Sequence, residues 1–257
     1  MIGSLLFNIG NFVWSAVMHI VCIPLLIAPA SWVWKAGHLW IDGTFLLLRI
    51  CCGIRYREIG LENLPKGPAI IAAKHQSTWE TMFLSRRLNQ PAFVLKKELL
   101  MIPLFGWFMQ KIGMIAVDRS GKATALKKMV KDAGDAFAAG RQIIIFPEGT
   151  RVAPGHHRAY QPGIAALYGQ LNVPVIPVAL NSGEFWPRNS FLKWPGEVTV
   201  VVGKPIETAG RTPQEVMDII IDEAGRQGLM IILDNHSQTD DGFMDDLWFG
   251  QGGFSEA

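Results

Sequence analysis

The chain has 257 residues, of which 49% are hydrophobic and 18% charged, and its formal net charge is +2. Such a small charge gives no basis for binding nucleic acid, whose phosphates attract clustered Lys and Arg. The hydrophobic share, with nine Trp and 14 Phe, is high for a soluble enzyme and typical of a protein that contacts lipid. The length fits one α/β domain with an appendage.

Two apolar stretches open the chain. Residues 5–30 contain no Asp, Glu, Lys or Arg and are long enough to cross a bilayer, but Pro24 and Pro29 interrupt them. Residues 38–50 form a second, shorter stretch, and arginines follow it where anionic headgroups would attract them. One true span and two helices dipping into one leaflet explain this pattern equally well. The sequence therefore predicts an apolar, helical membrane anchor over residues 1–57.

The next part, residues 58–228, alternates buried apolar runs with helical patterns, which is typical of βαβ units. Helices are indicated near residues 82–88 and 126–137, around 163–168, and from 212 onwards. We predict an α/β fold with a single mixed, largely parallel sheet flanked by helices, and with strands at 68–73, 92–95, 112–117, 142–146, 173–180 and 198–202. Pro174 and Pro177 place the fifth of these strands at a sheet edge or distort it.

Three further segments have no regular pattern of this kind. Residues 100–111 are densely apolar and fit either a buried core helix or a patch that contacts membrane or acyl chains. Residues 185–194 alternate aromatic and basic side chains, which fits a loop that touches lipid. Residues 229–257 are acidic, without Lys or Arg, and we expect this tail to be mobile.

The hexapeptide His75-Gln76-Ser77-Thr78-Trp79-Glu80 sits at the carboxyl end of the first predicted strand, just before a helix. Open α/β sheets bind their ligands at this position. With His75 on the loop and Glu80 in the first helical turn, the imidazole can act as a base whose tautomer the carboxylate fixes. A simpler interpretation also fits, because Ser77-x-x-Glu80 is a capping box that satisfies amide donors at a helix start.

Two further polar clusters follow predicted strands: Asp118 with Arg119, and Glu148-Gly149-Thr150-Arg151. Each cluster can be a local ion pair or a closed turn, and surface pairs contribute little stability. Convergence with the hexapeptide favours a site instead, since a base beside guanidinium groups suits a phosphate-bearing substrate with a reactive hydroxyl. Gly149 would let the backbone approach such a ligand.

These segments, in this order, resemble the four motifs of the glycerolipid acyltransferase superfamily, and in particular its 1-acyl-sn-glycerol-3-phosphate acyltransferases. The resemblance covers roughly residues 60–205, and its motifs are His75-x-x-x-x-Glu80, Gly113-Met114-Ile115-Ala116-Val117-Asp118-Arg119, Phe146-Pro147-Glu148-Gly149-Thr150-Arg151 and Val173-Pro174-Val175-Ile176-Pro177-Val178. One departure stands out: the family's usual partner for the histidine is Asp, and here it is Glu80.

The resemblance implies transfer of a fatty acyl group from acyl-CoA or acyl carrier protein to the 2-hydroxyl of lysophosphatidic acid, giving phosphatidic acid. It implies that His75 is the general base and that Glu80 orients it. The substrate phosphate would meet Arg151, helped by Arg119 and Lys96, and the residues that would position the substrate are Asp118, Glu148, Gly149 and Thr150. The acyl thioester is a co-substrate, so we expect no cofactor and no metal; no His or Cys cluster has ligand spacing.

Rival functions stay open at this stage. They are an acyltransferase of the same fold acting on another lyso-lipid, such as a lyso-ornithine lipid or a lysophospholipid, a catalytically silent membrane scaffold, and a hydrolase, although no Gly-x-Ser-x-Gly elbow is present. Cys22, Cys51 and Cys52 lie away from the motifs, which argues against a covalent cysteine route. Their odd number indicates reducing surroundings. We expect a membrane location, on the cytoplasmic side of a bacterial inner membrane.

Overall fold

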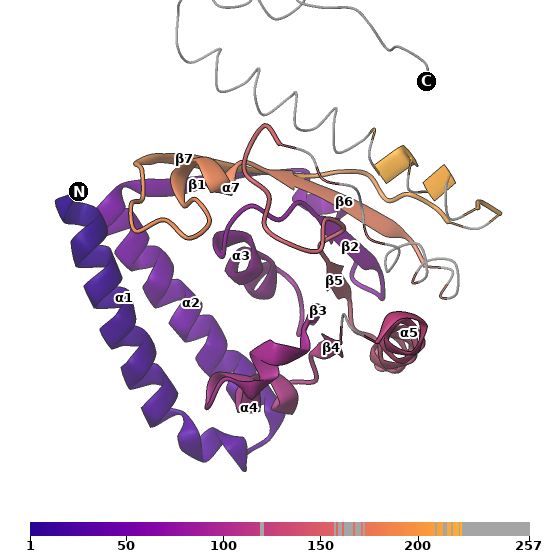
Figure 1. The fold of residues 1–257 in the computed structure, drawn as a ribbon, viewed down its shortest axis with the longest axis horizontal. Coiled ribbons are helices and arrows are strands. Elements are labelled where there is room, and N and C mark those ends of the chain that lie inside the picture. The colour runs from indigo at the N-terminus through magenta and orange to yellow at the C-terminus, as the bar shows by residue number, and fades with distance from the viewer. Residues whose placement is uncertain are drawn as a thin grey trace, which may run out of the picture.

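A seven-stranded sheet forms the centre of the computed structural model, which describes residues 1–118, 121–156, 158, 161, 167, 171, 173–208, 210–212, 215, 216, 218–220 and 222. Its strands are β1 (Ile54–Ile59), β2 (Ile70–Ala73), β3 (Ala92–Lys96), β4 (Ile115–Val117), β5 (Ile143–Ile145), β6 (Val175–Leu180) and β7 (Gly196–Val202). Their order is β1-β7-β6-β2-β5-β3-β4, and every neighbouring pair is parallel except β6 with β7 (Figure 1). The predicted single mixed, largely parallel sheet is confirmed.

Helices cover both faces of this sheet because successive strand residues point to opposite sides. In β2, Ile71 packs in one buried cluster with Phe83, whereas Ile70 packs in the other with Ala133. The helical elements are α1 (Ile2–Val21), η1 (Ile23–Leu26), α2 (Ala30–Cys52), η2 (Leu61–Asn63), α3 (Trp79–Arg87), η3 (Lys97–Met101), α4 (Phe105–Lys111), α5 (Lys122–Ala138) and α7 (Ser182–Phe185). Of the predicted helix at 163–168 only Leu167 is described, as a helical residue, and the tail at 229–257 lies outside the described residues.

The two N-terminal helices form an antiparallel hairpin, which we call the anchor hairpin (residues 2–52) and which Figure 1 shows along one side of the sheet. The expected interruptions are present, since Pro24 opens η1 and Pro29 caps α2. Phe7 and Leu48 are buried in the same core as Trp79. The anchor hairpin is therefore packed into the α/β fold, and the sheet already begins at Ile54, before the expected domain start at 58.

Asn11 and Ser15 of α1 face α2, and the outer surface of α1 is apolar. Asn11 Oδ1 accepts the hydroxyl of Thr44 at 3.1 Å, and the hydroxyl of Ser15 accepts the indole N–H of Trp40 at 3.0 Å. By length and composition α1 could cross a membrane, and only a small part of it is buried. The outer face of α1 carries the exposed residues Ile2, Leu5, Leu6, Ile9, Phe12, Val13, Val17, Ile20 and Val21.

Two strands differ from the sequence prediction. β6 lies inside the sheet, between β7 and β2, although Pro177 is within it and Pro174 directly precedes it. Pro177 lies just beyond the paired residues Val178–Leu180 and directs its backbone towards β7, where its carbonyl accepts Gly203 N–H at 2.8 Å. Because proline has no N–H, it cannot return that hydrogen bond, and the pairing of β6 with β7 stops there. β1 was not predicted at all. It pairs with β7, and one of the arginines assigned to headgroups, Arg57, pairs with Glu197 at 3.4 Å.

Residues 100–111 and the loop after α7 each contain both buried and exposed side chains. In residues 100–111, Phe108 is buried while Met101 and Trp107 are exposed, so the segment is partly core and partly surface. In the loop after α7, Phe191 and Trp194 are exposed as a lipid-touching loop requires. Lys193 is instead buried, and its ammonium donates to Asn8 Oδ1 at 2.7 Å, which fastens this loop to α1.

Candidate active site

The polar motifs meet at one edge of the sheet because β2, β3, β4 and β5 run parallel and end side by side. There a cavity of about 1070 Å³ opens. Seven of the predicted site residues line it, namely His75, Lys96, Asp118, Glu148, Gly149, Thr150 and Arg151. Glu80 lies behind His75, fully buried. Arg119 lies outside the described residues.

His75 and Glu80 are hydrogen-bonded across the start of α3. Trp79 opens this helix, so Glu80 falls in its first turn and His75 on the preceding loop, as predicted. Glu80 Oε1 accepts His75 Nδ1 at 2.8 Å and also the backbone N–H groups of Gln76 at 2.8 Å and Ser77 at 2.7 Å. The two interpretations of the hexapeptide are thus both realised, because one carboxylate holds the imidazole and satisfies the amides at the helix start.

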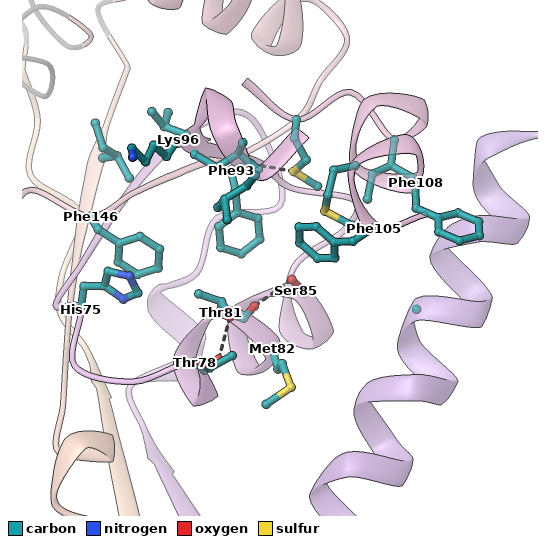
Figure 2. A pocket seen from close by; sticks show the side chains of 18 of the residues that line it. His75, Thr78, Thr81, Met82, Ser85, Phe93, Lys96, Phe105, Phe108 and Phe146 are labelled. Atoms are coloured by element: carbon teal, nitrogen blue, oxygen red, sulfur yellow. Dashed lines mark hydrogen bonds between the residues drawn. The ribbon is translucent and has the colours of Figure 1, made fainter. Parts of the chain in front are cut away.

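Contacts to both the backbone and the ring hold His75 in place. Its backbone N–H donates to Glu148 Oε2 at 3.0 Å, and its carbonyl accepts Val152 N–H at 2.7 Å. The imidazole stacks on Phe146, with ring centroids 3.9 Å apart, as Figure 2 shows at the cavity wall. With Nδ1 bound to Glu80, Nε2 is the nitrogen left for proton transfer with a molecule in the cavity.

Glu148 makes a different contact from the one expected. We expected it to position Arg151 or the substrate; its carboxylate, only 2% exposed, accepts the His75 amide and pairs with Lys74 Nζ at 3.5 Å. Gly149 adopts φ of +67°, a left-handed conformation that suits glycine, and an added Cβ would come within 2.8 Å of Gln161. This turn needs a glycine even before any ligand approaches.

Cationic side chains gather around the mouth of the cavity. Arg151 donates to the hydroxyl of Thr78 at 3.2 Å, and its carbonyl accepts Arg188 Nη1 at 3.1 Å. Lys96 lines the cavity while pairing with Glu98 at 3.2 Å, and Lys97 pairs with Asp118 at 3.3 Å on the surface. Lys96, Arg151 and Arg188 thus line the cavity that holds His75, and cationic side chains beside a base suit an anionic substrate.

The rest of the cavity is apolar and runs between α2, α3, α4 and β3. Figure 2 shows Phe93, Phe105 and Phe108 opposite Thr78, which precedes α3, and Thr81, Met82 and Ser85 within that helix. The anchor hairpin closes this arm, to which it contributes Met18, Cys22, Leu25, Val33, Trp34 and Ile41. Burial raises the pKa of the Cys22 thiol, so this cysteine is a poor nucleophile. Within the described part of the chain no group of His, Cys, Asp or Glu could hold a metal ion.

Sequence reasoning missed three residues of this site: Thr78, Ser182 and Arg188. Ser182 is the second residue after β6 and donates its hydroxyl to Glu80 Oε2 at 2.6 Å. Its position shortly after a predicted strand was the available signal. Because Pro174 and Pro177 favour an edge or a distorted strand, the sequence did not indicate that this strand ends beside His75. Arg188 was visible in the aromatic and basic segment, yet we assigned it to lipid rather than to the cavity.

Comparisons with known proteins show the family of the chain. A family model described as "Acyltransferase" matches residues 55–181, and together with the relative named next it places the chain in the acyltransferase class. It is 37% identical to the 1-acyl-sn-glycerol-3-phosphate acyltransferase of Pseudomonas aeruginosa, over 84% of this chain and 83% of that protein. It is 27% identical to the human 1-acyl-sn-glycerol-3-phosphate acyltransferase alpha, over 66% of this chain and 62% of the human one.

A solved structure confirms the fold. The 1-acyl-sn-glycerophosphate acyltransferase of Thermotoga maritima superposes with a TM-score of 0.67 and 19% identity, covering 92% of this chain and 99% of that one. The chain belongs to the 1-acyl-sn-glycerol-3-phosphate acyltransferase family.

Proposed function

We propose that this protein transfers a fatty acyl group from a thioester carrier, acyl-CoA or acyl carrier protein, to the sn-2 hydroxyl of lysophosphatidic acid. The product is phosphatidic acid. The observation that carries the proposal is the His75–Glu80 pair at 2.8 Å, in a cavity with cationic side chains at its mouth and apolar walls beyond. Such a site matches a lipid with one phosphate, one reactive hydroxyl and long hydrocarbon chains.

The chemistry needs one base and no covalent enzyme intermediate. His75 Nε2 takes the proton of the 2-hydroxyl while its oxygen attacks the thioester carbonyl. The C–O bond forms, the C–S bond breaks, and the imidazolium returns the proton to the departing thiolate. The Glu80 carboxylate stabilises the imidazolium in between. The amides of Gln76 and Ser77 already bond to Glu80, so they are not free to stabilise the oxyanion.

The shape of the cavity suggests how the substrates lie. The planar guanidinium of Arg151 can bind the phosphate through two parallel hydrogen bonds, with Lys96 nearby. Arg119 remains a proposed helper. An acyl chain would run into the apolar arm between α2 and α4, away from water. In this arrangement Glu148 acts on the substrate only through His75.

The anchor hairpin would lie on one leaflet of a membrane. Both ends of α1 contact the α/β fold: Ser4 bonds to the backbone of Lys193 at 3.0 Å, and His19 packs against Phe108 with ring centroids 6.1 Å apart. A helix held at both ends lies along the domain and does not stand away from it. Its exposed apolar face suits the interface plane. We place the protein on the cytoplasmic side of a bacterial inner membrane.

A substrate panel tests this function. Purified protein in mixed micelles should receive lysophosphatidic acid, lysophosphatidylcholine or a lyso-ornithine lipid, each with acyl-CoA and with acyl carrier protein. The predicted result is phosphatidic acid at a rate well above that of any other product. Preference for a lyso-lipid without a terminal phosphate would overturn the assignment of Arg151, and no transfer at all would favour a silent scaffold.

A further inference from the structure

The two oxygens of the Glu80 carboxylate have different partners. Oε1 accepts three hydrogen bonds, from His75 Nδ1 and from the amides of Gln76 and Ser77. Oε2 accepts one from the hydroxyl of Ser182, at 2.6 Å. Glu80 and Ser182 are both fully buried, at 0% exposure. A buried carboxylate with a hydroxyl this close is in a strong, charge-assisted hydrogen bond.

Ser182 is placed by the sheet itself. β6 lies beside β2 and runs parallel to it, so Ser182, the second residue after β6, meets the loop after β2. The next residue fixes the approach, because Gly183 N–H donates to Gln76 Oε1 at 3.1 Å. A Cβ on Gly183 would stand only 2.9 Å from Gln76 and from Pro154. The start of α7 is thus packed directly against the loop that carries His75.

The hydroxyl of Ser182 can fix the orientation of the Glu80 carboxylate. Rotation of a glutamate carboxylate about its last bond is soft, so side-chain rotamers alone do not fix the plane of the two oxygens. A donor at Oε2 fixes that plane and keeps Oε1 directed at Nδ1. The carboxylate oriented in this way holds the tautomer of the imidazole in which Nδ1 carries the proton.

We infer that Ser182 is a positioning residue of the reaction, which acts through Glu80 on His75. The inference rests on the proposed function and deepens it. It also accounts for the departure at position 80: where the related enzymes usually have Asp, this chain has a carboxylate one methylene longer, and its outer oxygen reaches Ser182. Ser182 keeps its proton throughout and touches neither substrate.

Kinetics of Ser182→Ala and Ser182→Cys test this role. Ser182→Ala should lower kcat by about 10- to 100-fold, the scale of one hydrogen bond to a charged group, with KM for the lyso-lipid unchanged. Ser182→Cys fills the space but donates weakly, so it should be as slow as Ser182→Ala. The control is Ser190→Ala, whose hydroxyl accepts Leu192 N–H on the nearby loop, and it should retain wild-type kcat. Wild-type turnover in Ser182→Cys would show that only volume matters and would overturn the inference.

A second readout needs no substrate. The proton between His75 Nδ1 and Glu80 should give a low-field NMR signal in protein with isotope-labelled histidine, and His75→Gln assigns it by removing it. Ser182→Ala should shift or broaden this signal, whereas Ser190→Ala should not. Because the signal is independent of the acceptor lipid, it tests Ser182 even if the substrate panel rejects lysophosphatidic acid. An unchanged signal in folded Ser182→Ala would contradict the positioning role.

A double-mutant cycle covers the case in which Ser182→Ala is unstable alone. Glu80→Asp shortens the side chain so that its carboxylate no longer reaches Ser182, while Ser182 stays in place. If the hydroxyl works through Glu80, adding Ser182→Ala to Glu80→Asp should cost less than about twofold in kcat. A full additional loss, with losses that multiply, would mean that Ser182 acts independently of Glu80.

Discussion

The buried carboxylate of Glu148 accepts the backbone N–H of His75 over 3.0 Å, which ties the motif after β5 to the loop after β2 that carries His75. Removing that acceptor in Glu148→Ala leaves a buried amide without its partner. The free energy of unfolding should fall by about 1–3 kcal/mol. Because the loop carries His75, kcat should fall while KM for the lyso-lipid stays within about twofold.

Glu148→Gln is the matched control, since its amide oxygen can still accept the His75 N–H. Chemical denaturation and steady-state kinetics of both variants decide the matter. The Gln variant should lie between Ala and wild type in stability and turnover. If KM rises in both variants while kcat is unchanged, Glu148 binds substrate directly and its contact with His75 is incidental.

Arg151 should not tolerate lysine. The ammonium of Lys cannot reproduce a planar guanidinium that reaches both a phosphate and the hydroxyl of Thr78. Arg151→Lys should therefore reduce kcat/KM by an amount equivalent to roughly 1.5–3 kcal/mol. Arg86→Lys is the control, because Arg86 pairs with Asp42 on the surface at 2.8 Å and should behave as wild type. Unchanged kcat/KM in Arg151→Lys would remove Arg151 from the phosphate site.

Membrane binding should depend on the outer face of α1 and can be separated from folding. Ile9, Phe12 and Ile20 are 55%, 74% and 63% exposed, so replacing all three with Gln leaves the core intact. Each loses roughly 1.5 kcal/mol or more of apolar burial in lipid, and binding to anionic vesicles should drop at least about 100-fold. Vesicle co-sedimentation and thermal unfolding measure the two effects.

A substitution on the buried face of α1 is the control for the triple Gln variant. Phe7 is 1% exposed, and Phe7→Ala should cost about 3–5 kcal/mol of stability while the outer face remains. Deleting residues 1–50 would therefore unfold the protein and report nothing specific about the membrane. Undiminished vesicle binding by the triple Gln variant would place the anchor elsewhere on the molecule.

Lys193 gives a pH-dependent contribution to stability. Burial lowers the pKa of its ammonium, and neighbouring Cys52 acts in the opposite sense. The unfolded state therefore binds this proton more tightly than the folded state. The free energy of unfolding should rise with pH between the folded-state pKa and the ordinary value of about 10.4. The difference between wild type and Lys193→Met isolates this term; a difference that falls over the alkaline range contradicts it.

The active-site motifs could be predicted because they are local in sequence. His75, Lys96, Asp118 and Glu148 each stand at the end of an apolar run, and parallel strands bring such ends to one edge. The sequence could not show that β6 lies beside β2, since Pro177 argues for an edge unless the pairing on both sides is known. For that reason the sequence did not indicate that Ser182 belongs to the site.

Other features depend on packing that no short pattern encodes. β1 is an edge strand that pairs only with β7, and its sequence is charged rather than apolar. Its Arg57 pairs with Glu197 of β7, which is distant in sequence. Lys193 reads as a surface cation, yet the carbonyls of its own loop and Asn8 of α1 enclose its ammonium. Both outcomes follow from contacts between residues far apart in the chain.

The most direct test of the account is the acyl-transfer rate of Glu80→Gln, measured with its melting temperature on one preparation. The Gln oxygen can accept the donors at the helix start, and its amide can face the Ser182 hydroxyl, so the fold should survive. Without the charge, the imidazolium of His75 loses its partner, and kcat for lysophosphatidic acid should fall by about two to four orders of magnitude. A melting temperature near wild type with collapsed turnover is the predicted result. Near-normal turnover would show that Glu80 only caps a helix and would contradict the mechanism.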